Sequence, residues 1–117
     1  MKIEKMYKVL YFNSGDGEDG ADESIAYPSS SLRGFLCRDA TNLFAYFDSI
    51  KDTHQDTTAD NHDLITLTIT SGTHRSVIKA ITDEIAYGDQ AFITVCNKDD
   101  EVFLDAKITN CAISLCE

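Results

Sequence analysis

The strongest constraint on the fold is a change of hydrophobic period between residues 64 and 88. Leu64–Thr70 (L-I-T-L-T-I-T) alternates apolar residues with threonine, which predicts a strand with one buried face. After Ser71-Gly72-Thr73, where Ser71 or Thr73 can cap a helix, the apolar residues recur at helical spacing: Val77, Ile78, Ile81 and Ile85. Gly88 suits the left-handed residue just beyond a helix end. A helix of about four turns is marginal alone, so its apolar stripe is expected to dock on a sheet.

Short segments rich in branched and aromatic residues predict further strands on both sides of this helix. They cover residues 7–12, 32–38, 43–50, 92–96, 102–104 and 108–115, with a short extended piece over 24–27. The Asp39–Asn42 tetrapeptide is typical of a hairpin turn. Since short turns favour antiparallel pairing, residues 1–117 are expected to form a single α+β domain. It is mainly antiparallel β (a curved sheet, small barrel or sandwich) with one amphipathic helix packed on it.

The charge of the chain disfavours several classes of partner. Twenty Asp and Glu residues stand against ten Lys and Arg residues, a formal net charge of −10, and the basic residues are scattered along the sequence. Nucleic acid and anionic membranes are therefore not expected as partners, and solubility is the simplest interpretation of the acidity. No apolar run approaches the ~20 residues of a membrane span, and the first residues do not resemble a secretory signal. A cytoplasmic or virion-associated location, without secretion through a signal peptide, is expected.

Two acidic stretches raise the alternative of a metal-binding module. Residues 16–23 (D-G-E-D-G-A-D-E) are rich in the oxygens that calcium prefers, but their glycines do not fit an EF-hand loop. Residues 51–63 contain His54 and His62 together with four aspartates, at a spacing that matches no familiar metal motif: Asp52, Asp56, Asp60 and Asp63. We expect solvated loops with no metal or cofactor, and an acidic loop that binds metal remains the alternative function.

No residue pattern specifies catalysis, and the protein is not expected to be an enzyme. His74 lies near Ser71, Thr73 and Ser76, but helix capping explains these hydroxyls, and no G-x-S-x-G occurs. Cys96 and Cys111 stand in apolar runs, where cysteine usually acts as a small hydrophobic residue. The chain contains no C-x-x-C pair and no glycine-rich phosphate-binding motif.

The segment Leu43–Phe47 is apolar on both faces of its predicted strand. Phe44 and Tyr46 project to one face, whereas Leu43, Ala45 and Phe47 project to the other. Such a strand is either sandwiched within the fold or buried in a subunit contact, and both readings remain open. We expect a homo-oligomer and take Phe44, Tyr46 and Phe47 as candidate interface residues.

Two long stretches resemble small uncharacterised proteins of marine bacteriophages and marine environmental metagenomes. They are D-L-I-T-L-T-I-T-S-G-T-H-R-S-V-I-K-A-I-T-D-E-I and F-I-T-V-C-N-K-D-D-E-V-F-L-D-A-K-I-T-N-C-A-I-S, with Y-F-N-S and Y-P-S-S-S-L-R-G upstream. The shared features are a threonine-rich strand, a short helix with a basic start, a strand that ends in an acidic turn and a final I-T-x-C segment. The resemblance covers most of the chain and implies a non-enzymatic, phage-encoded accessory protein, such as a virion component.

Overall fold

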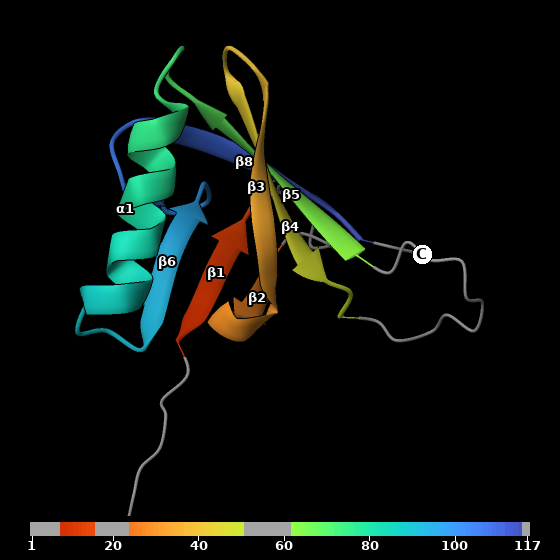
Figure 1. Cartoon of the computed structure of the whole chain (residues 1–117), viewed down its shortest axis with the longest axis vertical. Helices are drawn as coiled ribbons and strands as arrows, with labels where there is room; N and C mark the ends of the chain where they lie inside the picture. Colours follow the sequence, from red (N-terminus) through yellow and green to blue (C-terminus); the bar gives the residue numbers. More distant parts are fainter. Residues whose placement is uncertain (1–7, 16–23, 51–61, 116–117) are drawn as a thin grey trace, which may run out of the picture.

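The computed structural model describes residues 8–15, 24–50 and 62–115 and contains two β-sheets with one α-helix (Figure 1). The elements in chain order are β1 (Val9–Asn13), β2 (Ser24–Pro28), the short 3-10 helix η1 (Ser29–Ser31), β3 (Leu32–Asp39), β4 (Asn42–Asp48), β5 (His62–Ile69), α1 (His74–Tyr87), β6 (Phe92–Asn97), β7 (Val102–Phe103) and β8 (Ile108–Ser114). The predicted α+β class, rich in strands with a single helix, is confirmed.

The strands divide into a sheet A, with order β2-β1-β6-β7, and a sheet B, with order β3-β4-β5-β8. Four pairs of strands that are neighbours in sequence are antiparallel, as predicted: β1 with β2, β3 with β4, β4 with β5, and β6 with β7. The successive strands β2 and β3, and likewise β7 and β8, belong to different sheets. The β1–β6 pair is parallel, however, which short-turn connectivity did not predict. Along the chain, three strands of sheet B and α1 come after β1 and before β6. A long crossover therefore joins β1 to β6, instead of a short turn.

The inner faces of the two sheets share one hydrophobic core. In β5 the residues Ile65, Leu67 and Ile69 are buried, and the threonines between them face outward, as the alternation predicts. Three aromatic rings connect the sheets: the Phe47 ring of β4 stacks on Tyr27 at 4.2 Å between centroids and meets Phe12 edge-on at 5.7 Å. The aromatic side chains therefore hold sheet A against sheet B.

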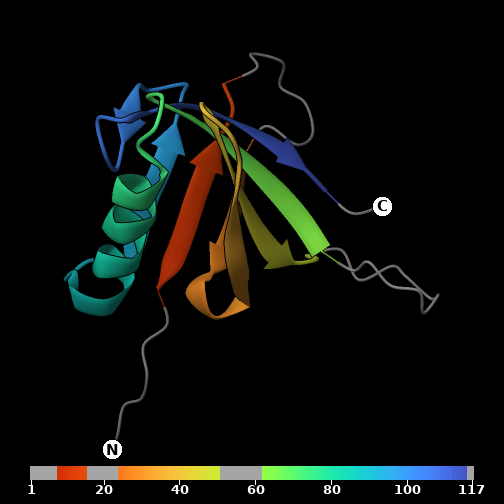
Figure 2. The ribbon, with the colours of Figure 1, turned by 45° about the horizontal axis from the view of Figure 1, so that its top comes forward.

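The helix α1 packs its apolar stripe into the same core. Val77 and Ile81 are buried with the β5 residues, and Ile78 and Ile85 pack against this cluster while partly exposed. Figures 1 and 2 show α1 running alongside β6. The predicted docking of the stripe is thus confirmed. Within the described ranges, no helix combines the length and the apolarity needed to cross a membrane.

The two ends of α1 differ from the expected caps. At the start, Gly72 has φ +75°, which supports the turn from β5, and the Thr73 hydroxyl donates to the Thr70 carbonyl at 2.7 Å rather than capping the helix. At the other end, Gly88 is extended with φ −71°, so the predicted left-handed conformation is wrong. Its carbonyl accepts a hydrogen bond from Lys8 Nζ at 2.6 Å, which ties the end of α1 to the beginning of β1.

Candidate functional site

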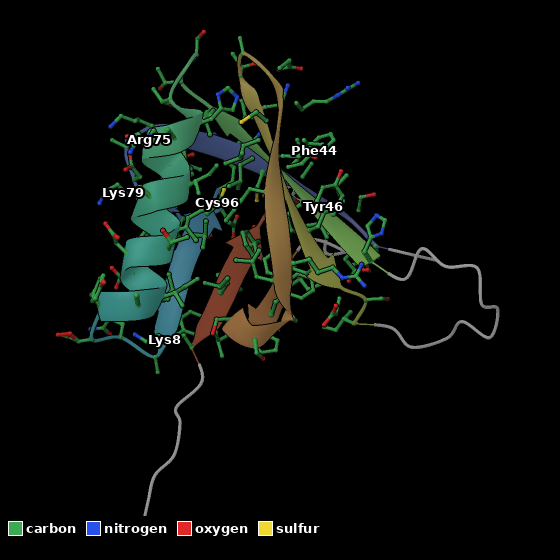
Figure 3. All side chains as sticks on the ribbon, viewed as in Figure 1. Lys8, Phe44, Tyr46, Arg75, Lys79 and Cys96 are labelled. Atoms are coloured by element: carbon green, nitrogen blue, oxygen red, sulfur yellow. The ribbon has the colours of Figure 1, made fainter. Side chains whose placement is uncertain are left out.

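The candidate interface strand β4 places its aromatic residues on two different faces. Phe44 and Tyr46 point outward from sheet B and are partly exposed, whereas Phe47 is only 1% exposed and belongs to the core. Figure 3 shows Phe44 and Tyr46 on the side of the molecule opposite α1. The structure therefore separates Phe47 from the other two candidate residues, and only Phe44 and Tyr46 lie on a surface.

The strand register adds two apolar residues that the sequence analysis did not select. Leu36 of β3 lies opposite Phe44 and is 51% exposed, and Leu64 of β5 lies opposite Tyr46. We call the surface formed by Leu36, Phe44, Tyr46 and Leu64 the aromatic face. Counting outward from the predicted turn at Asp39–Asn42 would have placed Cys37 opposite Phe44. The register shift between Cys37 and Asp39 puts Leu36 there instead, and no sequence pattern predicted that shift.

Ring contacts fix the geometry of the aromatic face. The rings of Phe44 and Tyr46 are nearly perpendicular, with centroids 6.1 Å apart, and the His62 ring meets Tyr46 edge-on at 5.2 Å. The guanidinium carbon of Arg38 lies 5.8 Å from the Phe44 centroid, a cation–π contact worth about 0.5–1 kcal/mol at an exposed site. These contacts keep the two large rings in defined orientations on an exposed sheet.

The aromatic face carries few charges for so acidic a protein. The described charged groups beside it include Arg38, the neighbouring Asp39 carboxylate and an ion pair between Arg33 Nε and Asp48 Oδ1 at 2.9 Å, so positive and negative charges balance there. The whole chain has a formal charge of −10. This part of the surface is therefore apolar at its centre and nearly neutral at its margin.

The second residue of β5, Asp63, is a buried carboxylate on the core face of the strand. Asp63 has no exposed surface, and its Oδ2 accepts hydrogen bonds from the Tyr27 hydroxyl at 2.7 Å and from the Ile50 backbone N–H at 3.1 Å. Sequence analysis placed Asp63 with the solvated loop aspartates, and this assignment is wrong. The carboxylate instead joins the end of the β4 segment to the start of β5 and to β2 of the other sheet.

This carboxylate gives Tyr27 an unusual titration. Burial, and then the hydrogen bond and negative charge of Asp63, raise the pKa of the Tyr27 hydroxyl far above its usual value. An unfolded tyrosine ionises near pH ~10. Because the folded pKa is raised, the stabilisation is fully present below pH ~10 and is lost as the pH rises above it.

We therefore expect Tyr27→Phe to change both the stability and its pH dependence. Near pH ~7 the variant should lose about 1–3 kcal/mol, because a buried carboxylate loses a donor. Above pH ~10 the wild type should lose up to about 1.4 kcal/mol more per pH unit than the variant. Urea unfolding followed by circular dichroism measures both effects. Parallel pH profiles for the two proteins would show that the hydroxyl titrates normally in the folded state.

The remaining sequence candidates have structural partners. His74 Nε2 lies 2.7 Å from the Asp39 carbonyl and so joins the start of α1 to the β3–β4 hairpin. Cys96 and Cys111 are buried, as their apolar neighbours predicted. Hydrogen bonding from Cys111 lowers the pKa of the Cys96 thiol despite its burial, with Lys98 adding to the effect. The two cysteines belong to different sheets, so this contact helps to join them.

The metal hypothesis falls mostly on residues that lie outside the described part of the chain. This applies to residues 16–23 and to His54 with three of its neighbouring aspartates. The remaining members, His62 and Asp63, lie in β5. Among residues 8–15, 24–50 and 62–115, no group of three or more histidine, cysteine or acidic side chains could hold a metal ion.

The structure thus defines an α+β protein with two packed sheets and an exposed aromatic sheet face. Comparison with protein-family models, with curated proteins and with solved structures found no match to this chain. Its function must accordingly be inferred from its own residues and their surroundings.

Proposed function

We propose that this protein is a non-enzymatic structural or interaction protein that forms a homo-oligomer through the aromatic face. The observation that carries the proposal is the exposure of Leu36 beside Phe44 and Tyr46 on a nearly neutral surface of a chain with net charge −10. Aromatic residues are enriched at protein interfaces, and charged residues are depleted from interface centres. Burying the apolar area supplies roughly 25 cal/mol per Å².

A second copy of the chain fits this surface better than an anionic partner of another kind would. Two copies related by a twofold axis would bring the same patch together, so Phe44 and Tyr46 of each copy could pack against their equivalents. The net charge of each copy opposes the approach, and this repulsion is weakest where the surface is nearly neutral. Since salt screens the repulsion, association through the aromatic face should strengthen as ionic strength rises.

Because the chain resembles small marine phage proteins, we propose that it is an accessory component of the virion. A compact module that associates with itself suits repeated assembly on a particle. The genes beside this one provide an independent check. Adjacent capsid or tail genes would support a virion role, whereas adjacent metabolic genes would count against it.

Sedimentation velocity with matched variants tests self-association. The wild type should form a defined oligomer at micromolar concentration, and Tyr46→Lys should raise the dissociation constant about tenfold or more, as expected for loss of an interface aromatic with added charge. Tyr87→Lys is the control, because Tyr87 is the most exposed large apolar residue described and lies at the end of α1. A wild type that stays monomeric at high concentration and high salt would overturn the proposal, as would equal effects of the two variants.

A further inference from the structure

A groove of about 610 Å³ lies between α1 and β3, away from the aromatic face. Ile78 of α1 and Cys37 of β3 give it an apolar lining, and His74, Arg75, Lys79 and Thr82 line it from the helix. Ligand sites commonly measure about 300–1,000 Å³ and combine apolar walls with a few polar groups. The groove is therefore large enough for a short stretch of polypeptide.

The strand on one side of this groove has an unpaired edge. In the described residues β3 is the terminal strand of sheet B and pairs only with β4. Cys37 lies opposite the buried Leu43 and so faces inward, yet it remains exposed because the groove opens beside it. An exposed edge offers backbone N–H and C=O groups to an incoming strand.

The groove is positive although the protein is strongly acidic. Its lining includes Arg75, Lys79 and His74, and no Asp or Glu among the residues that the structure describes. Figure 3 shows Arg75 and Lys79 one turn apart on the first half of α1. Lys79 pairs with Asp83 at 2.8 Å, but both side chains are largely exposed, so the pair is weak and an incoming carboxylate can compete for the lysine.

We propose that this groove binds an extended acidic segment of a partner protein, which adds to the free edge of β3 as a fifth strand of sheet B. Backbone hydrogen bonds to β3 would supply affinity for any extended chain. Carboxylates that reach Arg75 and Lys79 would supply the preference for an acidic sequence. The groove lining shares no residue with the aromatic face, although both surfaces use β3, so each proposal is tested with its own variant.

Fluorescence anisotropy with the full chain tests the sequence preference. The probe is a labelled peptide of alternating Glu and Val, as long as the eight-residue β3. It should bind at least about tenfold more tightly than the same peptide with Gln in place of Glu, a difference of about 1.4 kcal/mol. Binding should weaken between about 0.05 and 0.5 M NaCl, opposite to the salt effect expected for self-association.

Charge reversal in the groove provides the matched variants. Arg75→Glu should weaken binding of the acidic peptide about tenfold or more. Lys98→Glu makes the same charge change at a cation outside the groove lining and should have little effect. Equal affinity for the Glu and Gln peptides, or equal effects of the two variants, would overturn the proposal.

Two further measurements separate strand addition from loose electrostatic contact. Bound peptide should slow hydrogen exchange of the β3 amides over Leu32–Asp39 and, in a Cys116→Ser background, should protect Cys37 from N-ethylmaleimide. Binding without protection of β3 would contradict strand addition. Protection of Cys37 by raised protein concentration alone would assign the groove to a second copy and overturn the acidic-partner proposal. Tyr46→Lys should leave peptide binding unchanged, so either proposal can fail alone.

Discussion

Replacing Asp63 with alanine is expected to lower the free energy of unfolding by about 3 kcal/mol or more. The change removes the acceptor of two hydrogen bonds, from the Tyr27 hydroxyl and the Ile50 N–H, at a position with no exposed surface. Each buried donor left without a partner costs about 1–3 kcal/mol. Since small proteins are stable by only about 5–15 kcal/mol, this single change should remove a large part of the total.

Two comparisons isolate this effect in urea unfolding experiments. Asp63→Asn keeps one carbonyl oxygen for both donors but loses the charge and replaces the other oxygen with an NH2 group, so its cost should lie between those of the wild type and the alanine variant. Asp83→Ala removes an exposed carboxylate from an i,i+4 ion pair and should cost about 0.3–0.5 kcal/mol. If Asp63→Ala were as mild as Asp83→Ala, the carboxylate would be solvated after all.

The two phenylalanines of β4 should respond in opposite ways to truncation. Phe47→Ala is expected to destabilise the fold by about 3–5 kcal/mol, because this ring packs on Tyr27 and Phe12 of the other sheet. Phe44→Ala should cost no more than about 1 kcal/mol of stability, yet it should weaken self-association. Thermal unfolding and sedimentation velocity on the same samples measure both quantities.

A milder substitution controls for the loss of volume at the core position. Phe47→Leu keeps an apolar side chain of moderate size and should cost much less than Phe47→Ala. Equal stability losses for Phe44→Ala and Phe47→Ala would mean that both faces of β4 are covered in the folded monomer. That result would contradict the proposal that the aromatic face is an interface.

Local periodicity was sufficient to predict the elements that depend on local sequence. The alternation through Ile65, Leu67 and Ile69 defines β5, and the spacing of Val77 and Ile81 defines α1, because each pattern places apolar groups on one face. The parallel β1–β6 pair could not be predicted in this way. No turn or periodic pattern reports which distant strand will become a neighbour.

The candidate sites, too, were predictable only where they depend on residues close in sequence. Sequence alone predicted that Phe44 and Tyr46 share a face, but both faces of β4 are apolar, so only the second sheet reveals that Phe47 is covered. Asp63 looked like a loop residue because its partner Tyr27 lies 36 positions away. The groove likewise needs Cys37 and the start of α1 to meet, which only the tertiary structure brings about.

The parallel pairing of β1 with β6 also governs the order in which this molecule can assemble. Hydrogen bonds from Val9–Asn13 reach a strand that is synthesised about 80 residues later, so a ribosome-bound chain cannot finish sheet A until most of its length has emerged. Closing so long a loop costs entropy, so we expect folding times in the millisecond-to-second range that is typical of domains rich in non-local strand pairs. We expect folding to begin with β3, β4 and β5, because these strands are close in sequence and pair with one another, whereas β8 joins sheet B later.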